Sequence, residues 1–271
     1  GGCRLGRYRY SGVEFPAHRA VVRGRLMSAA LEISDLRVVL GGRDILRRVQ
    51  FSARPGETIA LLGGSGTGKS VTLKAILGLL PATAGAVRID GVDVLAEPAT
   101  RASEARARIG MLFQGGALFD SLSIWENIGF RLLHAEGFSR AESRDRALEM
   151  LDAVGLDRAL AERRPADLSG GQQKRAGLAR ALAAEPEVLF FDEPTTGLDP
   201  LSAGRIDALM AETVDRTGAT AVMITHDLAS VRRVCQRVAF LWEGEIGWEG
   251  PVDQLDDSGF EPLQAFLRGR D

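Results

Sequence analysis

The stretch ETIALLGGSGTGKSVTLKAILGLL, residues 57–80, decides the fold class of this chain. Its apolar start, Glu57–Leu62, predicts a short buried strand, and Lys69–Leu80 predicts a helix that stops before Pro81. Between them, residues 63–70 match G-x-x-x-x-G-K-[ST] in the strand-then-helix context that this pattern requires. The three features together predict a phosphate-binding loop in an α/β protein.

The residue types of this phosphate loop suit a nucleoside triphosphate bound with Mg²⁺. Glycines let backbone N–H groups approach phosphate oxygens, and the helix N-terminus adds its positive dipole end. We expect Lys69 to contact the β- and γ-phosphates and the Ser70 hydroxyl to ligate Mg²⁺. A glycine-rich structural turn is the alternative. The predicted loop residues are Gly63, Gly64, Ser65, Gly66, Thr67, Gly68, Lys69 and Ser70.

Strands and helices alternate on both sides of this loop, which favours a largely parallel sheet covered by helices. The predicted strands are Leu31–Leu40, Ile45–Ala53, Ala86–Ile89, Val92–Leu95, Ile109–Phe113, Val188–Phe191, Thr220–Ile224, Val238–Trp242 and Glu245–Trp248. The predicted helices are Ile124–Leu133, Arg140–Val154, Gly171–Ala184, Ser202–Arg216, Leu228–Cys235, Val252–Leu255 and Pro262–Leu267. The sequence therefore predicts a mostly parallel core sheet, an N-terminal antiparallel β-subdomain and an α-helical insert.

Composition sets the expected domain limits and excludes some classes. The net charge is −2, no apolar run approaches the roughly 20 residues of a membrane span, and the two cysteines are far apart. Residues 1–28 hold six arginines and one acid, so the remainder is acidic and a nucleic-acid partner is not expected. We expect 1–28 to be a non-native or disordered basic extension, with Met27 as the natural start; a basic targeting arm is the alternative. Residues 29–250 would form the main domain, with a helical subdomain at about 115–184, and 251–271 a helical tail.

A pair of acids follows the apolar run Val188–Phe191. Carboxylates at the carboxyl end of a buried strand lie where open α/β sheets bind ligands. We expect Asp192 to coordinate Mg²⁺ and Glu193 to polarise the attacking water as a general base. A solvated acidic turn is the alternative, and the phosphate loop argues against it.

The motif LSGGQ at Leu168–Gln172 completes a pattern of spaced motifs. Together with the phosphate loop and Asp192-Glu193, it makes the chain from Leu31 to about Trp248 resemble the nucleotide-binding subunits of ATP-binding-cassette (ABC) transporters. We call Leu168–Gln172 the signature motif. The resemblance implies ATP and Mg²⁺ as ligands and ATP hydrolysis as the activity.

The same resemblance assigns further residues. It implies that Gln114 senses Mg²⁺ and the γ-phosphate, that Asp199 lies at a dimer interface, and that His226 contacts the γ-phosphate. It also implies a head-to-tail dimer in which the signature motif of one copy closes over the ATP held by Lys69 of the other. The signature residues concerned are Ser169, Gly170, Gly171 and Gln172.

Position 40 departs from the family pattern. Members usually place an aromatic side chain there to stack on adenine, and this chain has Leu40. We expect weaker stacking, replaced by apolar contact or by Arg43, and therefore less selectivity for ATP over GTP.

The stretch FQGGALFDSLSIWENI, residues 113–128, resembles that of the Mla-type ATPases, which energise phospholipid transport with MCE-class substrate-binding proteins. Pro262–Leu267 resembles their short tail helix. The resemblance implies an integral membrane permease and an MCE-type protein as partners, and a place at the cytoplasmic face of a bacterial inner membrane. Leu118, Phe119, Leu122 and Trp125 would line the groove for a permease helix, or else pack the core of the insert.

Three other functions remain as alternatives. The chain could serve another ABC importer, or it could be a soluble ABC ATPase of the translation or DNA-repair type. A single cassette without sustained heptads argues against the soluble types. A regulatory module that holds ATP without turnover is disfavoured by Glu193 and His226.

Overall fold

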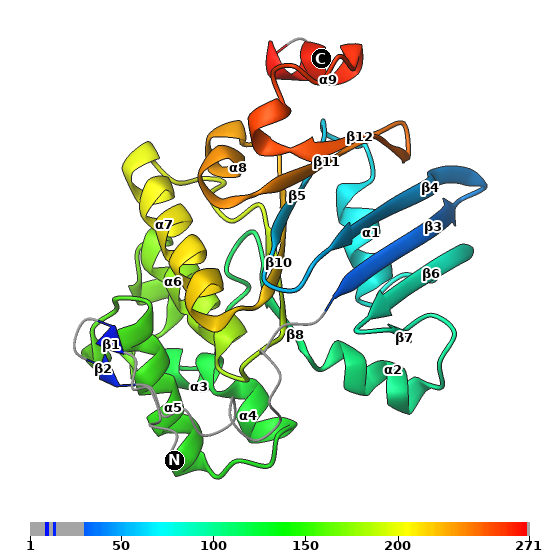
Figure 1. Ribbon diagram of the computed structural model, residues 1–271. Coiled ribbons are helices and arrows are strands. Elements are labelled where there is room, and N and C mark those ends of the chain that lie inside the picture. The colour runs from blue at the N-terminus through cyan, green and yellow to red at the C-terminus, as the bar shows by residue number, and fades with distance from the viewer. Residues whose placement is uncertain (1–8, 11–12, 15–29, 270–271) are drawn as a thin grey trace, which may run out of the picture.

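The computed structural model describes residues 9–10, 13–14 and 30–269, and the structural statements below concern these residues (Figure 1). The strands are β1 Arg9–Tyr10, β2 Val13–Glu14, β3 Leu31–Leu40, β4 Arg43–Ala53, β5 Thr58–Leu62, β6 Ala84–Ile89, β7 Val92–Asp93, β8 Ile109–Leu112, β9 Val188–Asp192, β10 Thr220–Thr225, β11 Arg237–Trp242 and β12 Glu245–Pro251. The α-helices are α1 Lys69–Ile76, α2 Ala99–Arg106, α3 Ile124–Ile128, α4 Phe130–His134, α5 Arg140–Ala153, α6 Gly170–Leu182, α7 Pro200–Thr217, α8 Leu228–Val234 and α9 Glu261–Leu267. Short 3₁₀ turns occur at Arg158–Leu160, Pro165–Asp167 and Val252–Gln254.

The main sheet of the described chain has ten strands in the order β7-β6-β3-β4-β12-β11-β5-β10-β9-β8. The run β11-β5-β10-β9-β8 is parallel throughout. At the other end, β3 pairs antiparallel with both β4 and β6. The predicted fold class, a mostly parallel core sheet with an N-terminal antiparallel subdomain and a helical insert, is confirmed.

Two hydrophobic cores lie on opposite faces of the parallel strands, because successive side chains of a strand point to opposite faces. In β5, Ile59 and Leu61 belong to one core, and Ala60 and Leu62 to the other. The first core is covered by α1 and α2, and the second by α7, α8 and the helices α3–α6 of the insert (Figure 1). This three-layer packing fixes the carboxyl ends of β5, β8, β9 and β10 at one edge.

Two predicted helices differ from the observed ones, and one observed helix was not predicted. Helix α1 ends at Ile76 rather than Leu80, because Gly78 has φ +73° and leaves the helical conformation. The helix predicted over Ile124–Leu133 is two short helices that meet at Gly129, which packs closely against the Ser143 carbonyl. Helix α2 was not predicted, because it buries only Ala102 and Ala105 and so lacks an apolar stripe.

The expectation for residues 1–28 falls mostly outside the described residues. Within that segment the structure describes β1 and β2, which pair antiparallel with each other. Among the described residues, no helix combines the length and apolar character that a bilayer crossing requires.

Candidate functional site

The phosphate loop joins the fully buried β5 to α1. A Cβ at Gly63 would lie 2.7 Å from the Leu241 carbonyl oxygen, and one at Gly68 would lie 2.6 Å from Leu46 Cδ2. Gly68 also has φ +111° and caps α1 without a side-chain hydrogen bond. The first amides of α1 are thus left for an external anion, as a phosphate-binding helix terminus requires.

Lys69 spans the mouth of this loop. Its Nζ donates hydrogen bonds of 2.7 Å to the carbonyl oxygens of Gly63 and Gly64. Burial lowers the pKa of Lys69, while the Glu193 and Asp192 carboxylates act in the opposite direction. The ammonium group is therefore held between the loop and the two acids, where a polyphosphate with its cation would lie.

The donor set fits Mg²⁺-ATP. Ser70 is exposed beside Lys69, and Asp192 lies at the end of β9. Burial raises the pKa of the Asp192 carboxyl and the Glu193 charge raises it further, which a bound cation would offset. No cluster of three or more His, Cys, Asp or Glu that could hold a metal occurs in the described ranges. Mg²⁺ does not need one, since it is commonly held by one or two protein oxygens, substrate phosphates and water.

Glu193 and His226 meet at the same sheet edge. Glu193 Oε1 lies 2.9 Å from His226 Nδ1, and its Oε2 accepts a 2.9 Å hydrogen bond from the Thr196 hydroxyl. The Glu193 side chain is 15% exposed, whereas that of His226 is 62% exposed. The contact arises because β9 and β10 are neighbouring parallel strands, so that the loops after them lie side by side.

Glu193 also adopts an unusual backbone conformation. Its φ is +46°, in the left-handed region that costs a non-glycine residue roughly 1–3 kcal/mol. Its amide donates to the Ile224 carbonyl oxygen at 2.8 Å, which anchors it to β10. The threonines that support its carboxylate, Thr196 and Thr225, were missed from sequence. Their positions, directly after Glu193-Pro194-Thr195 and directly before His226, were the available clue.

A buried polar network holds this loop from behind. The Ser230 hydroxyl lies 2.9 Å from Asp227 Oδ2 and 3.0 Å from Asp207 Oδ2. Thr195 Oγ1 lies 3.3 Å from the Ser230 oxygen, and Arg233 pairs with Asp207 at 3.1 Å. The network links the loops after β9 and β10 to α7, and sequence reasoning did not identify it.

Gln114 follows β8 and is exposed, at the same sheet edge as Asp192. We call Gln114–Ala117 the glutamine loop. Its backbone carbonyls accept hydrogen bonds from Lys174 and Arg180 of α6. Neither cation was predicted from sequence to touch this loop.

The signature motif begins α6. Ser169 caps the helix: its hydroxyl accepts from the Gln172 amide, and Gln172 Oε1 accepts from the Ser169 amide at 2.9 Å. Asp199 caps α7 in the same way, through 3.0 Å hydrogen bonds from the Leu201 and Ser202 amides. The hydrogen bond with Ser202 lowers the pKa of Asp199. Both motifs are thus fixed by helix capping within their own chain.

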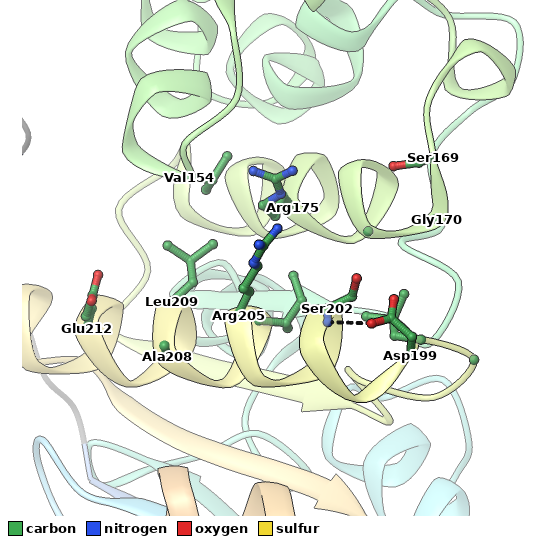
Figure 2. A pocket seen from close by; sticks show the side chains of 14 residues that line it. Val154, Ser169, Gly170, Arg175, Asp199, Ser202, Arg205, Ala208, Leu209 and Glu212 are labelled. Atoms are coloured by element: carbon green, nitrogen blue, oxygen red, sulfur yellow. Dashed lines mark hydrogen bonds between the residues drawn. The ribbon is translucent and has the colours of Figure 1, made fainter.

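Ser169, Gly170, Gly171 and Asp199 line one end of a cleft of about 570 Å³ between α6 and α7 (Figure 2). Arg205 extends from α7 toward Arg175 of α6, whose guanidinium donates to the Gly155 carbonyl oxygen. Burial lowers the pKa of Arg175, and the Arg205 charge lowers it further. Two arginines and the two acids Asp199 and Glu212 thus line the cleft, and no residue of the phosphate loop is among those described as lining it.

Three apolar positions differ in accessibility. Leu40, at the end of β3, is 36% exposed, so an apolar side chain stands where the family usually has an aromatic one. Trp125 is only 3% exposed and packs in the core, with the Arg140 guanidinium 4.6 Å from its ring. For Trp125 the core-packing interpretation holds. Phe119 is 46% exposed and rests on Phe130, so it is available to a partner.

The site combines the phosphate loop, the carboxylates of Asp192 and Glu193, and the signature motif on a helical insert. This combination is that of a cassette that hydrolyses nucleoside triphosphates. Comparison with known proteins identifies the family to which this cassette belongs. Residues 46–196 match the family model described as "ABC transporter".

The chain is 36% identical over 252 residues to the probable ribonucleotide transport ATP-binding protein mkl of Mycobacterium tuberculosis H37Rv, covering 93% of this chain and 70% of that protein. It is 37% identical over 255 residues to the chloroplastic protein TRIGALACTOSYLDIACYLGLYCEROL 3 of Arabidopsis thaliana, covering 88% and 73% respectively. The dimeric structure of the cassette MJ0796 in a post-hydrolysis state with ADP and Pi superposes with a TM-score of 0.73 at 31% identity. That match covers 82% of this chain and 98% of the other. The chain belongs to the ABC transporter family, as an ATP-binding cassette that hydrolyses ATP with Mg²⁺.

Proposed function

We propose that the chain powers phospholipid transport across or between the membranes of a bacterial envelope. It acts as a head-to-tail dimer at the cytoplasmic face of the inner membrane, bound to an integral membrane permease and working with an MCE-type substrate-binding protein. The observation that carries this proposal is the stretch at residues 113–128, which resembles that of the Mla-type ATPases. The Arabidopsis relative, which is named for trigalactosyldiacylglycerol, a lipid, supports it.

In the proposed site, Lys69 and the first amides of α1 hold the β- and γ-phosphates. Ser70 and Asp192 hold Mg²⁺, with Gln114 as a further contact. The bound cation neutralises charge on the phosphate oxygens. These residues fix the phosphates in place before any bond is broken, and this positioning is the main source of catalysis in phosphoryl transfer.

Glu193 is the proposed general base that takes a proton from the attacking water. His226 Nδ1, 2.9 Å from Glu193 Oε1, orients the carboxylate and leaves its second ring nitrogen for the γ-phosphate. The Thr196 hydroxyl donates to the other carboxylate oxygen and limits its rotation. This geometry suits a base that must be held within hydrogen-bond reach of one water.

The second half of the site is proposed to come from another copy of the chain. Ser169, Gly170, Gly171 and Asp199 line one end of the cleft between α6 and α7, and Gln172 follows Gly171 in α6. The resemblance to ABC cassettes assigns these residues to the nucleotide held by a partner copy.

The permease is proposed to dock against Phe119. A half-exposed aromatic ring supported by Phe130, next to the partly buried Leu118, offers an apolar surface to a short helix. Ribonucleotide transport, named for mkl, is the second candidate, and it predicts a different substrate-binding partner.

Purification of the tagged chain from the membranes of its host tests this function. We expect a permease and an MCE-type protein to copurify, and phospholipid to stimulate ATP hydrolysis by the complex. Stimulation by ribonucleotides or amino acids instead would contradict the lipid assignment, and recovery without any permease would contradict a transport role.

A matched pair of variants tests the docking surface. Phe119→Asp should lose the permease while still binding ATP. Trp242→Asp, at another aromatic ring that is 39% exposed and stacks on Phe240, should keep it. Equal loss of the permease in both variants would argue against Phe119 as its contact.

A further inference from the structure

The glutamine loop is attached to helix α6 by the hydrogen-bond donors of two cations. Lys174 Nζ donates to the Gln114 carbonyl oxygen. Six residues later along α6, Arg180 donates to the carbonyl oxygens of Gly116 at 3.2 Å and Ala117 at 2.6 Å. Three of the four carbonyls of the loop are therefore held by one helix, the helix that begins with the signature motif.

Loop and helix approach each other more closely than ordinary side chains allow. A Cβ at Gly177 of α6 would lie 3.0 Å from Gly116 Cα, and a Cβ at Gly116 would lie 3.0 Å from the Gln173 carbonyl oxygen. Ala117 has φ +46°, a conformation that persists in a non-glycine residue only when its surroundings hold it. The two segments thus pack as one rigid piece.

Lys174 also reaches the catalytic side of the site. It is 5% exposed, and its Nζ lies 3.4 Å from the Glu193 carbonyl oxygen. Burial lowers the pKa of Lys174, whereas the Asp192 and Glu193 charges act in the opposite direction. A buried cation is tolerated when carbonyls and nearby carboxylates compensate its desolvation, and Lys174 has both.

We propose that Lys174 is a positioning residue for ATP hydrolysis: it fixes Gln114 to the signature helix and joins this pair to the loop of Glu193. When α6 shifts at its signature end, Gln114 then moves with it, and the contact between Lys174 and the Glu193 carbonyl oxygen changes as well. The inference rests on the roles proposed above for Gln114 and Glu193, and it does not depend on which substrate is transported.

The test is Lys174→Met in the full chain, which keeps a long apolar stem and removes the donor. Because small displacements of catalytic groups cost about 10²-fold, we expect kcat for ATP hydrolysis to fall at least about tenfold. KM for ATP should change less than about threefold, since the phosphate loop is untouched. An unchanged kcat, or a loss confined to KM, would overturn the proposal.

Arg146→Met is the matched control. Arg146 is also partly buried and donates to a backbone carbonyl, that of Ala183 at the end of α6. Its other partners, Glu149 and Glu185, lie away from the nucleotide site. We expect its kcat to stay near that of the unmodified chain. An equal loss in both variants would mean that α6 packing, not the Lys174 contact, matters.

Two further measurements separate positioning from folding. Lys174→Gln, which retains a donor, should recover part of the kcat lost in Lys174→Met, and amide exchange in Lys174→Met should accelerate at residues 114–117 but not across the core strands. Exchange that accelerates everywhere, with no recovery in the Gln variant, would assign Lys174 a general folding role and overturn the proposal.

A double-variant cycle connects Lys174 to Gln114. If Lys174 acts through Gln114, the loss in Gln114→Ala with Lys174→Met should be smaller than the product of the two single losses. Fully multiplicative losses would overturn the proposal. A normal kcat in Gln114→Ala alone would instead contradict the role proposed for Gln114, so the two failures are distinguishable.

Discussion

The phosphate loop and the signature motif, both built on glycines at the start of a helix, differ in what completes them. The phosphate loop has Lys69, the Ser70 hydroxyl proposed to hold Mg²⁺ and the two acids within the same chain, and Lys69 donates to the Gly63 and Gly64 carbonyl oxygens. The signature motif instead caps its own helix and borders an open cleft. The first region thus holds the groups of an anion site within one chain, whereas we propose that a partner copy completes the second.

The largest expected effect concerns Glu193, the acid that lies in the same chain as the phosphate loop. Glu193→Gln should lower kcat by about 10²–10⁴-fold, the usual contribution of a general base, while ATP still binds. The closed dimer should then accumulate in the presence of ATP. Phosphate release and nucleotide binding measured on the same sample check this. Turnover at the unmodified rate would show that Glu193 is not the base.

The next effect tests phosphate binding itself. Lys69→Ala removes a half-buried ammonium and should weaken ATP binding by at least about tenfold, because hydrogen bonds to charged groups contribute about 1.5–3 kcal/mol. Calorimetric titration of the isolated chain with Mg²⁺-ATP measures it. Unchanged affinity for ATP would contradict this role, because the phosphate loop would then not bind ATP through the Lys69 ammonium group.

A substitution in the signature motif should behave in the opposite way. A Cβ at Gly171 meets nothing within 4 Å, so Gly171→Glu can fold while placing a carboxylate where a partner's nucleotide would lie. We expect ATP affinity of the isolated chain to be unchanged and ATP-dependent dimerisation to be lost, as measured by light scattering. Weakened ATP binding by the monomer would mean that the signature motif also contributes to the nucleotide site of its own chain.

The smallest expected effect concerns the contact between residue 40 and the adenine base of the nucleotide. Leu40→Tyr supplies an aromatic face at a position that is 36% exposed, and stacking contributes about 0.5–1.5 kcal/mol. ATP binding should therefore tighten by about two- to tenfold, and the preference over GTP should rise. A competition titration with the two nucleotides measures both, and tighter binding of neither would mean that the base does not contact residue 40.

Sequence reasoning reached the parts of this site that are contiguous in the chain. The phosphate loop, the acids at the end of β9 and the capped signature motif each follow from local residue types and spacing. The Glu193–His226 contact needed the strand order, because it depends on β9 and β10 being neighbours.

Lys174 and Trp125 show a different limit. A helical pattern indicates that α6 has a buried face, but it does not say that a buried lysine on that face meets the Gln114 carbonyl. Trp125 stands among apolar residues beside a loop, where exposure and burial are equally compatible with the sequence. Its burial follows from the packing of α3 against α5 and α6, which are remote in sequence.

The central claim, that each ATP site takes its phosphate loop from one copy and its signature motif from another, can be tested by mixing two inactive variants. Lys69→Ala damages only the phosphate loop, and Gly171→Glu damages only the signature motif. In a head-to-tail mixed dimer, one site combines both defects and the other has neither. We predict that ATP hydrolysis, absent in each variant alone, returns on mixing. No recovery in mixtures shown to contain the mixed dimer would contradict it, because the complete site would then lie within one chain.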